Sequence, residues 1–318
     1  MYDVVIIGSG PAGLTAAIYS ARANLSTVLL TGDMFGGQIA TTNDVENYPG
    51  FTEIAGPDLC LRMREQTEKF GAEVIADSII EFDPDGPPFK LTGRSEIYEA
   101  RSVIVASGAS PRYLGVPGEQ ELWGRGVSYC ATCDGAFFQG MPVAVVGGGD
   151  SALQEGLFLT RFASKVTVIH RRDELRAGAH LRQRAEADDK IEFVWDTAVT
   201  EIQGKDDVTS LALRNLKTGE EGELGVDGVF IFIGHFPNSE IYKGKLEMDD
   251  EGYVIADAKM HTSVEGVFVA GEAQDHYFRQ AITAAGDGCK AAMEAEKFIA
   301  QLDASRVAEE PAIATAGS

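Results

Sequence analysis

Short apolar runs separated by longer amphipathic stretches set the pattern of this chain. The apolar runs lie at residues 4–7, 27–30, 102–108, 142–146 and 166–170. Runs of this length, several of them closed by glycine, are typical of strands buried on both faces of a parallel sheet. Helical composition follows at 14–23, 57–70 and about 279–301. The pattern therefore predicts strands that alternate with helices.

Two segments each contain a strand, a glycine turn, a helix and a second strand. The first segment covers residues 4–30 and the second covers residues 142–170. Each is close to the ~30 residues of a βαβ unit, in which a helix crosses between two parallel strands. We therefore expect an α/β fold with two Rossmann-like dinucleotide-binding domains, each a three-layer ββα arrangement.

Glycine and proline gather at 113–118 and at 234–244, and we interpret these places as crossings between the domains. The simplest layout puts one domain at 1–113 plus 243–318 and inserts the second domain at 114–242. The tail from Asp303 onward is rich in alanine, glutamate and serine. We expect this tail to be frayed.

A glycine-rich turn opens the helix of each unit. In a G-x-G-x-x-G turn the first glycine permits the tight turn, the second lets the backbone approach a pyrophosphate, and the third lets the helix pack closely on the sheet. The phosphate charge then meets the helix N-terminus. The first turn is Gly8, Ser9, Gly10, Pro11, Ala12 and Gly13, and the second is Gly147, Gly148, Gly149, Asp150, Ser151 and Ala152. Because each turn follows an apolar strand, both predict a dinucleotide site.

The residues after the second turn indicate an NADP(H) site. About 20 residues beyond that turn, where this fold contacts the adenosine ribose, the chain has His170, Arg171, Arg172 and then Arg176. A carboxylate at this place would select NAD. Guanidinium groups instead match the geometry of a 2′-phosphate, so we expect selectivity for NADP(H).

The residues after the first turn favour a different nucleotide, such as FAD. No arginine pair follows this turn. The corresponding place is taken by Thr31, Gly32 and Asp33, followed by Gly36, Gly37 and Gln38.

Between the two turns lies a Cys-x-x-Cys pair, Cys130 and Cys133, with Asp134 directly after it. The two sulfurs of such a pair can close a small ring, and a thiolate is the reactive nucleophile. Asp134 could exchange protons with a sulfur. Zinc needs four ligands, and because the chain has no second pair of this kind we expect no metal. A static disulfide is disfavoured in a reducing compartment, so the motif predicts a redox-active dithiol.

Composition narrows the function classes. The chain has 318 residues, 44% of them hydrophobic, and a formal net charge of −22. Such acidity argues against nucleic acid or an anionic membrane as a partner. The N-terminus lacks the positive region of a signal peptide, and the uncharged stretch at 4–21 is interrupted by glycine and proline. We expect a soluble, cytoplasmic protein.

Together these residues resemble the low-molecular-weight, bacterial-type thioredoxin reductases, from about residue 2 to residue 300. The resemblance rests on the two glycine turns, the segment at 130–135, the arginines at 171–176, and shorter pieces at 36–38, 45–50, 106–109 and 279–281. It implies a homodimeric enzyme that passes electrons from NADPH through FAD and the dithiol to its partner, thioredoxin.

The resemblance also implies a role for each part of the site. Cys133 would face the flavin, Cys130 would attack the disulfide of thioredoxin, and Asp134 would serve as acid and base for the thiols. The inserted domain would rotate about the two crossings. NADPH would lie on the second turn and on His170, Arg171, Arg172 and Arg176. FAD would lie on the first turn and on Thr31, Gly32, Gly36, Gly37, Gln38, Asn47, Gly271, Glu272, Arg279, Gln280 and Ala281.

One residue departs from the family pattern. After its late strand the family has Gly-Asp, with the aspartate on the ribityl chain of the flavin, whereas this chain has Gly271 and Glu272. Glutamate keeps the charge but adds a methylene. We expect weaker or altered FAD binding than with aspartate.

Three other interpretations stay open. A ferredoxin-dependent flavin reductase of the same fold would use a different donor, although the arginines at 171–176 speak against it. A small-molecule dithiol oxidase would use oxygen as acceptor and would not need those arginines. A redox-sensing protein without enzymatic activity is disfavoured by two complete nucleotide sites.

Overall fold

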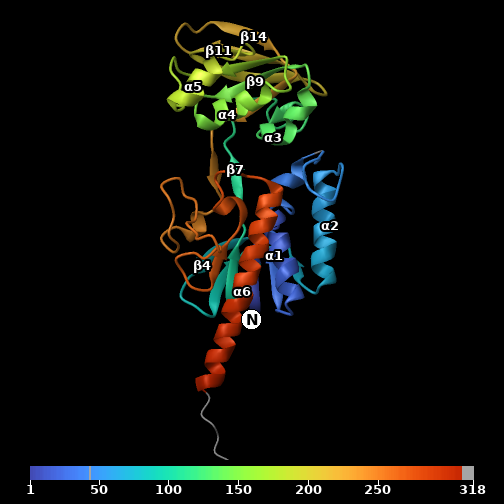
Figure 1. Ribbon diagram of the computed structural model, residues 1–318, viewed down its shortest axis with the longest axis vertical. Coiled ribbons are helices and arrows are strands. Elements are labelled where there is room, and N and C mark those ends of the chain that lie inside the picture. The colour runs from blue at the N-terminus through green and yellow to red at the C-terminus, as the bar shows by residue number, and fades with distance from the viewer. Residues whose placement is uncertain (43, 310–318) are drawn as a thin grey trace, which may run out of the picture. The chain divides into compact units, whose positions relative to one another are not determined.

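The computed structural model describes residues 1–42 and 44–309, and the chain divides into two compact units. The first unit combines Met1–Ser110 with the chain from Phe236 onward, and the second unit is Pro111–His235. The two crossings between them, β7 (Ala109–Pro111) and β16 (His235–Pro237), pair as a two-stranded sheet. Figure 1 traces both units along the chain.

The domain boundaries lie earlier in the chain than we expected, although β16 falls within the crossing that we expected at 234–244. The sequence suggested domain boundaries at 113 and 242, whereas the units divide after Ser110 and after His235. The second difference has a clear cause. Tyr242, in the short helix η3 (Glu240–Tyr242), is fully buried in the first unit, with its ring centroid 5.9 Å from that of Phe82. Burial of this large side chain holds the segment in the first unit, and glycine and proline spacing carries no signal of it.

The first unit is built on a seven-stranded sheet with the order β3-β2-β1-β6-β5-β4, in which β17 also pairs with β6. β1, β2, β3, β6 and β17 run parallel, whereas β4 and β5 are antiparallel to their neighbours. The strands are β1 (Tyr2–Ile7), β2 (Thr27–Leu30), β3 (Glu73–Ile75), β4 (Ile79–Asp83), β5 (Phe89–Gly93), β6 (Ile97–Val105) and β17 (Val267–Val269). The helices are α1 (Pro11–Arg22), η1 (Gly37–Thr41), α2 (Gly56–Lys69), η4 (Gly271–Ala273) and α6 (Ala281–Glu309).

Strand β1 is buried on both faces, as its uninterrupted apolar sequence predicts. Val4 and Ile6 pack in one core with α1, α2 and α6. Val5 and Ile7 pack in a second core with side chains of β4, β5 and the segment around Tyr242. Each such buried side chain contributes on the order of 1.5–3 kcal/mol through removal of apolar surface from water. Helices, sheet and outer strands therefore form three layers.

Helix α6 lies alongside α1 (Figure 1) because small residues line the contact. A Cβ atom at Gly288 would lie 2.1 Å from the carbonyl oxygen of Ala12, so only glycine permits this approach. The helix extends to Glu309, so it includes residues 303–309, for which the sequence led us to expect fraying. Arg101, largely buried, forms ion pairs with Asp303 and with Asp3, which holds this end of the helix. The rest of the expected tail, 310–318, lies outside the described residues.

The second unit repeats the three-layer plan around a parallel sheet with the order β11-β10-β9-β15-β8. These strands are β8 (Val127–Ser128), β9 (Pro142–Gly147), β10 (Lys165–Ile169), β11 (Ile191–Val194) and β15 (Gly228–Phe232). A separate antiparallel sheet contains β12 (Thr197–Gly204), β13 (Val208–Asn215) and β14 (Glu221–Gly225). The helices are α3 (Ala131–Asp134), η2 (Gly135–Phe138), α4 (Asp150–Leu159) and α5 (Ala179–Glu186).

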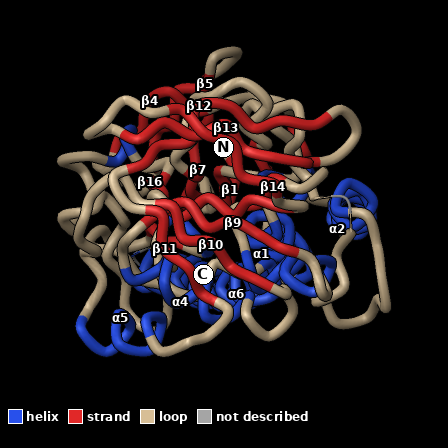
Figure 2. Tube along the Cα trace, turned by 90° about the horizontal axis from the view of Figure 1, so that it is seen from above, coloured by secondary structure: helices blue, strands red, loops and turns tan. Residues whose placement is uncertain are grey.

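The two faces of β9 again pack against different layers. Val143 and Val145 pack in a core with α4 and α5, whereas Ala144 and Val146 pack in a core with β12 and β13. Figure 2 shows α4 and α5 on one side of β9, β10 and β11, with β12 and β13 on the other. The α/β class with two Rossmann-like units, the second inserted into the first, is confirmed. In the part of the chain that the structure describes, no helix combines the length and the apolarity needed to cross a membrane.

Candidate active site

The first glycine turn lies at the carboxyl edge of the parallel strands in the first unit. Gly8 has a φ of +111°, and a Cβ there would lie 2.2 Å from the carbonyl oxygen of Ala106, which follows β6. A Cβ at Gly13 would lie 1.8 Å from the oxygen of Gly8, so α1 packs directly on the turn. A Cβ at Gly10, by contrast, would meet only the oxygen of Gly36, at 3.8 Å. Gly8 and Gly13 therefore serve the fold, and Gly10 leaves open space before the N-terminus of α1.

Ser9 joins this turn to the loop after β2. Its hydroxyl donates to the carbonyl oxygen of Thr31 at 3.0 Å and accepts from the backbone N–H of Gly36 at 3.0 Å. A Cβ at Gly37 would lie 3.4 Å from the Cα of Gly10. The Gln38 side chain donates to the carbonyl oxygen of Ala109. The structure thus gathers the residues at 31–38 around the turn, while Asn47 is exposed in the loop after η1.

The end of β17 reaches the same edge of the sheet. Gly271 has a φ of +69°, and a Cβ added there would lie 3.0 Å from the Cβ of Ala12. Glu272 follows, and burial raises the pKa of its carboxyl to about 7. The charge of Arg279 opposes this rise and the charge of Asp275 adds to it. Arg279 has a φ of +51° and donates to the hydroxyl of Tyr253 at 3.2 Å. Gln280 and Ala281 lead into α6 directly afterwards.

The second glycine turn has the same division between packing and open space. A Cβ at Gly147 would lie 2.4 Å from the carbonyl oxygen of Phe232, and one at Gly148 would lie 2.3 Å from the ring of His170. A Cβ at Gly149 would meet nothing within 4 Å. Asp150 begins α4 and accepts from the backbone N–H of Gly178 at 2.7 Å. Ser151 and Ala152 complete the first turn of that helix.

The arginine segment is fixed to this turn. The backbone N–H groups of Arg176 and Ala177 donate to the carbonyl oxygen of Gly148 at 2.8 and 3.2 Å. Leu175 and Ala177 are buried, while the side chains of Arg171, Arg172 and Arg176 are exposed. His170 is buried beneath Gly148, and this burial, helped by the three arginine charges, lowers its pKa. A buried histidine with a lowered pKa therefore lies under the turn, and the three arginines that follow it are exposed.

The two cysteines form a disulfide with an S–S distance of 2.06 Å. Topology explains where it lies. β8 is parallel to β15, and β15 is parallel to β9, so the carboxyl end of β8 lies at the same sheet edge as the second turn. Cys130 comes two residues after β8, and α3 then carries Cys133 and Asp134. The dithiol and the second turn therefore share one edge of one sheet.

Asp134 is connected to Cys130 through a serine that sequence reasoning missed. The Ser128 hydroxyl donates to a carboxyl oxygen of Asp134 at 2.5 Å and accepts from the backbone N–H of Cys130 at 3.1 Å. Burial raises the pKa of Asp134, and the bond from Ser128 opposes that rise. The Thr132 hydroxyl lies 3.4 Å from the sulfur of Cys130. A hydroxyl two residues ahead of a cysteine is not a motif, so only the structure reveals this connection.

Glu119 is a second residue that the sequence did not single out. It is 1% exposed and accepts from the backbone N–H groups of Leu114 and Gly115 and from the hydroxyl of Tyr129. It thereby fixes the residue before Cys130 to the loop that leads into the unit. Of the two aromatic residues after the dithiol, Phe138 packs on Phe230 in the core, whereas Phe137 is exposed.

Comparison with known proteins settles the family. The model of the pyridine nucleotide-disulphide oxidoreductase family matches residues 2–288. A thioredoxin reductase of Mycolicibacterium smegmatis is 52% identical over 95% of this chain and 98% of its own. The chain belongs to this family, among its thioredoxin reductases. A thioredoxin reductase of Bacillus subtilis is 50% identical over 95% of the chain and 96% of its own.

Solved structures agree. The crystal structure of thioredoxin reductase from Streptococcus pyogenes superposes with a TM-score of 0.91 at 46% identity, covering 95% of this chain and 99% of the other. The resemblance inferred from the motifs is thereby confirmed. The chain is an oxidoreductase that acts on a sulfur group, in a family of pyridine nucleotide-dependent flavoproteins with a redox-active disulfide.

Proposed function

We propose that this enzyme passes electrons from NADPH through FAD to the Cys130–Cys133 disulfide and from there to the disulfide of a thioredoxin. The observation that carries the proposal is the closed disulfide at the same sheet edge as a glycine turn flanked by three exposed arginines. The relatives named thioredoxin reductase cover nearly the whole chain, which supports thioredoxin as the substrate.

The first unit fits FAD and the second fits NADPH. Gly10 and Gly149 are the positions where an added Cβ would occupy open space before a helix N-terminus, and a pyrophosphate needs this space. The loop at 31–38, Glu272 and Arg279 would hold the remainder of FAD. Arg171, Arg172 and Arg176 would bind the 2′-phosphate of NADPH, since guanidinium pairs with phosphate through paired hydrogen bonds. Bound FAD would supply two-electron redox chemistry between a nicotinamide and a disulfide.

The dithiol would then reduce thioredoxin by exchange. The Cys130 thiolate attacks one sulfur of the thioredoxin disulfide, and the other thioredoxin sulfur leaves as a thiolate. The Cys133 thiolate attacks Cys130, which releases reduced thioredoxin and closes the Cys130–Cys133 disulfide again. Asp134 supplies and takes up the protons of these steps. Its raised pKa brings proton release closer to neutral pH, where a general acid works best.

The remaining features of the proposal rest on the resemblance of the sequence motifs to the family. We infer a homodimer with symmetric subunits, a cytoplasmic location, and rotation of the inserted unit about the crossings at β7 and β16. Rotation would let the dithiol and NADPH use the flavin in turn.

Anaerobic mixing of the FAD-loaded enzyme with NADPH tests the electron path. We expect the flavin absorbance to bleach rapidly with NADPH and much more slowly with NADH, and added oxidised thioredoxin to restore it. A flavin that NADPH does not bleach, but reduced ferredoxin does, would refute NADPH as the donor. Restoration by oxygen alone, without thioredoxin turnover, would indicate a dithiol oxidase.

A further inference from the structure

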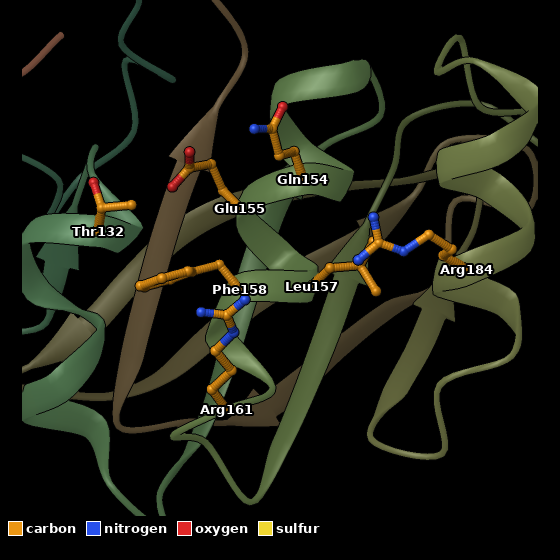
Figure 3. Close-up of a pocket in the computed structure, with 7 residues that line it drawn as sticks. All are labelled: Thr132, Gln154, Glu155, Leu157, Phe158, Arg161 and Arg184. Atoms are coloured by element: carbon orange, nitrogen blue, oxygen red, sulfur yellow. The ribbon is translucent and has the colours of Figure 1, made fainter. Parts of the chain in front are cut away.

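A pocket of about 250 Å³ lies in the second unit, beside the disulfide and away from the arginine segment. It runs along α4 from α3 to α5. Figure 3 shows Thr132 and Glu155 toward one end, Arg184 at the other end, and Phe158 with Arg161 between them. None of the roles proposed above uses these residues.

The pocket reaches the reactive sulfur through Thr132. This residue lines the pocket, and its hydroxyl lies 3.4 Å from the sulfur of Cys130. A group seated in the pocket is therefore one side chain away from the atom that attacks the substrate disulfide. A site for a substrate, rather than a distant binding surface, has this proximity.

The charges in the pocket favour an anion. The guanidinium of Arg161 lies 5.1 Å from the ring centroid of Phe158, which holds it over the pocket. Neither Arg161 nor Arg184 forms an ion pair with an acidic side chain among the described residues. Arg182, on the same helix as Arg184, does pair with Glu174, at 3.4 Å. Glu155 is the one carboxylate of the pocket, at the end near Thr132, so the lining carries a net positive charge.

These cations stand out because the chain as a whole carries a net charge of −22. A negative protein repels an acidic partner at long range, so attraction of an acidic side chain depends on the arginines at the contact itself. Opposite charges at that contact fix the partner's orientation and register.

The volume bears on the size of the group that the pocket can hold. Sites for complete small molecules and cofactors measure about 300–1,000 Å³ and enclose most of the ligand. A pocket of about 250 Å³ is smaller than that range. It suits one carboxylate side chain presented by a larger molecule.

We propose that this pocket receives an aspartate or glutamate side chain of the protein substrate, from the surface around its disulfide, and so orients that disulfide toward Cys130. The inference rests on the proposed function, since it names how the thioredoxin is recognised. Arg161 and Arg184 bind the carboxylate, and the apolar surface of Phe158 excludes water from the ion pairs.

Charge reversal tests the inference. The double variant Arg161→Glu/Arg184→Glu is assayed for thioredoxin reduction at low salt, beside the wild type and a control with Lys205→Glu. Lys205 is exposed in the turn between β12 and β13 of the same unit and does not line the pocket. We expect the KM for thioredoxin to rise by about tenfold or more in the double variant, with a smaller dependence on salt. The control should change less than twofold.

Two further measurements separate docking from other causes. Anaerobic flavin reduction by NADPH and reduction of the neutral hydroxyethyl disulfide should both stay within about twofold of the wild type. A thioredoxin in which an acidic side chain beside the disulfide is replaced by lysine should have a lower KM with the double variant than wild-type thioredoxin has.

Unchanged thioredoxin kinetics in the double variant would overturn the inference, as would an equal loss with the neutral disulfide. Slower flavin reduction would assign the arginines to the nucleotide side and overturn it as well. Failure of the proposed function looks different, because the wild type itself would then not reduce thioredoxin.

Discussion

Replacing Glu272 by glutamine should stabilise the flavin-free protein, by an amount that grows as the pH rises from about 4.5 to about 7. Burial raises the pKa of this carboxyl from 4.5 to about 7. Between these values the folded protein holds a proton that the unfolded chain has released, so the free energy of unfolding falls as pH rises. A difference of this size corresponds to about 3 kcal/mol, at 1.36 kcal/mol for each pKa unit. Below pH 4.5 the carboxyl is protonated in both states and the penalty vanishes.

Glutamine has nearly the same shape and no charge, so the variant should lack this penalty. Urea unfolding of the flavin-free proteins at pH 8 and at pH 5 measures this penalty as the difference in the free energy of unfolding between the variant and the wild type. We expect the variant to be more stable by about 3 kcal/mol at pH 8 and by much less at pH 5. Both tryptophans, Trp123 and Trp195, lie in the second unit. Tryptophan fluorescence therefore reports the unfolding of the second unit, and its midpoint should stay the same in the variant. The part of the circular dichroism change that comes from the first unit should shift to higher urea concentration.

Equal stability of the wild type and Glu272→Gln at pH 8 would show that the Glu272 carboxylate does not destabilise the fold. So would a gap that stays the same from pH 8 to pH 5, because a packing effect does not titrate. Glu53→Gln, which changes an exposed carboxylate of the same unit, serves as the control and should match the wild type at both values.

Three further predictions concern the nucleotide sites. Gly10→Ala should leave the flavin-free fold intact but weaken FAD binding at least tenfold, as measured by fluorescence titration, and normal FAD affinity in this variant would contradict the prediction. Gly13→Ala should instead prevent folding, because its Cβ would lie 1.8 Å from a backbone oxygen. Arg172→Ala should raise the KM for NADPH about tenfold and leave the KM for NADH unchanged. Equal changes in both KM values would show that Arg172 does not bind the 2′-phosphate. Glu272→Asp should bind FAD more tightly than the wild type, and equal affinities would count against a cost of the extra methylene.

The glycine turns were predictable because the interactions that form them are local. Gly8 and Gly147 each follow an apolar strand and open a helix, and the whole signal lies within about 30 residues. The role of Gly13 follows in the same way from the packing of α1 on β1. The Cys130–Cys133 pair was predictable because a disulfide of this spacing closes within one turn of chain.

The remaining features depend on contacts between distant segments. Tyr242 is assigned to the first unit by burial against Phe82, which lies on the distant strand β4. The end of α6 is held by Arg101, from β6, although its sequence suggests a loose tail. Glu119 and Ser128 carry no motif at all, and their importance comes from the groups that fold around them. Amino-acid pattern reports periodicity, and it does not report which distant partner a single polar side chain will find.

The hydroxyl of Ser128 links the protonation state of Asp134 to the backbone of Cys130, and this link requires no movement of the backbone. This hydroxyl carries one hydrogen, and two acceptors compete for it, the carboxyl oxygen of Asp134 at 2.5 Å and the carbonyl oxygen of Cys130 at 3.3 Å. An ionised Asp134 accepts the hydrogen bond from this hydroxyl. A protonated Asp134 can donate to the serine instead, and the hydroxyl then turns toward the carbonyl of Cys130. The direction of one rotatable O–H bond therefore couples the hydrogen bonding at the carbonyl of Cys130 to the protonation state of Asp134.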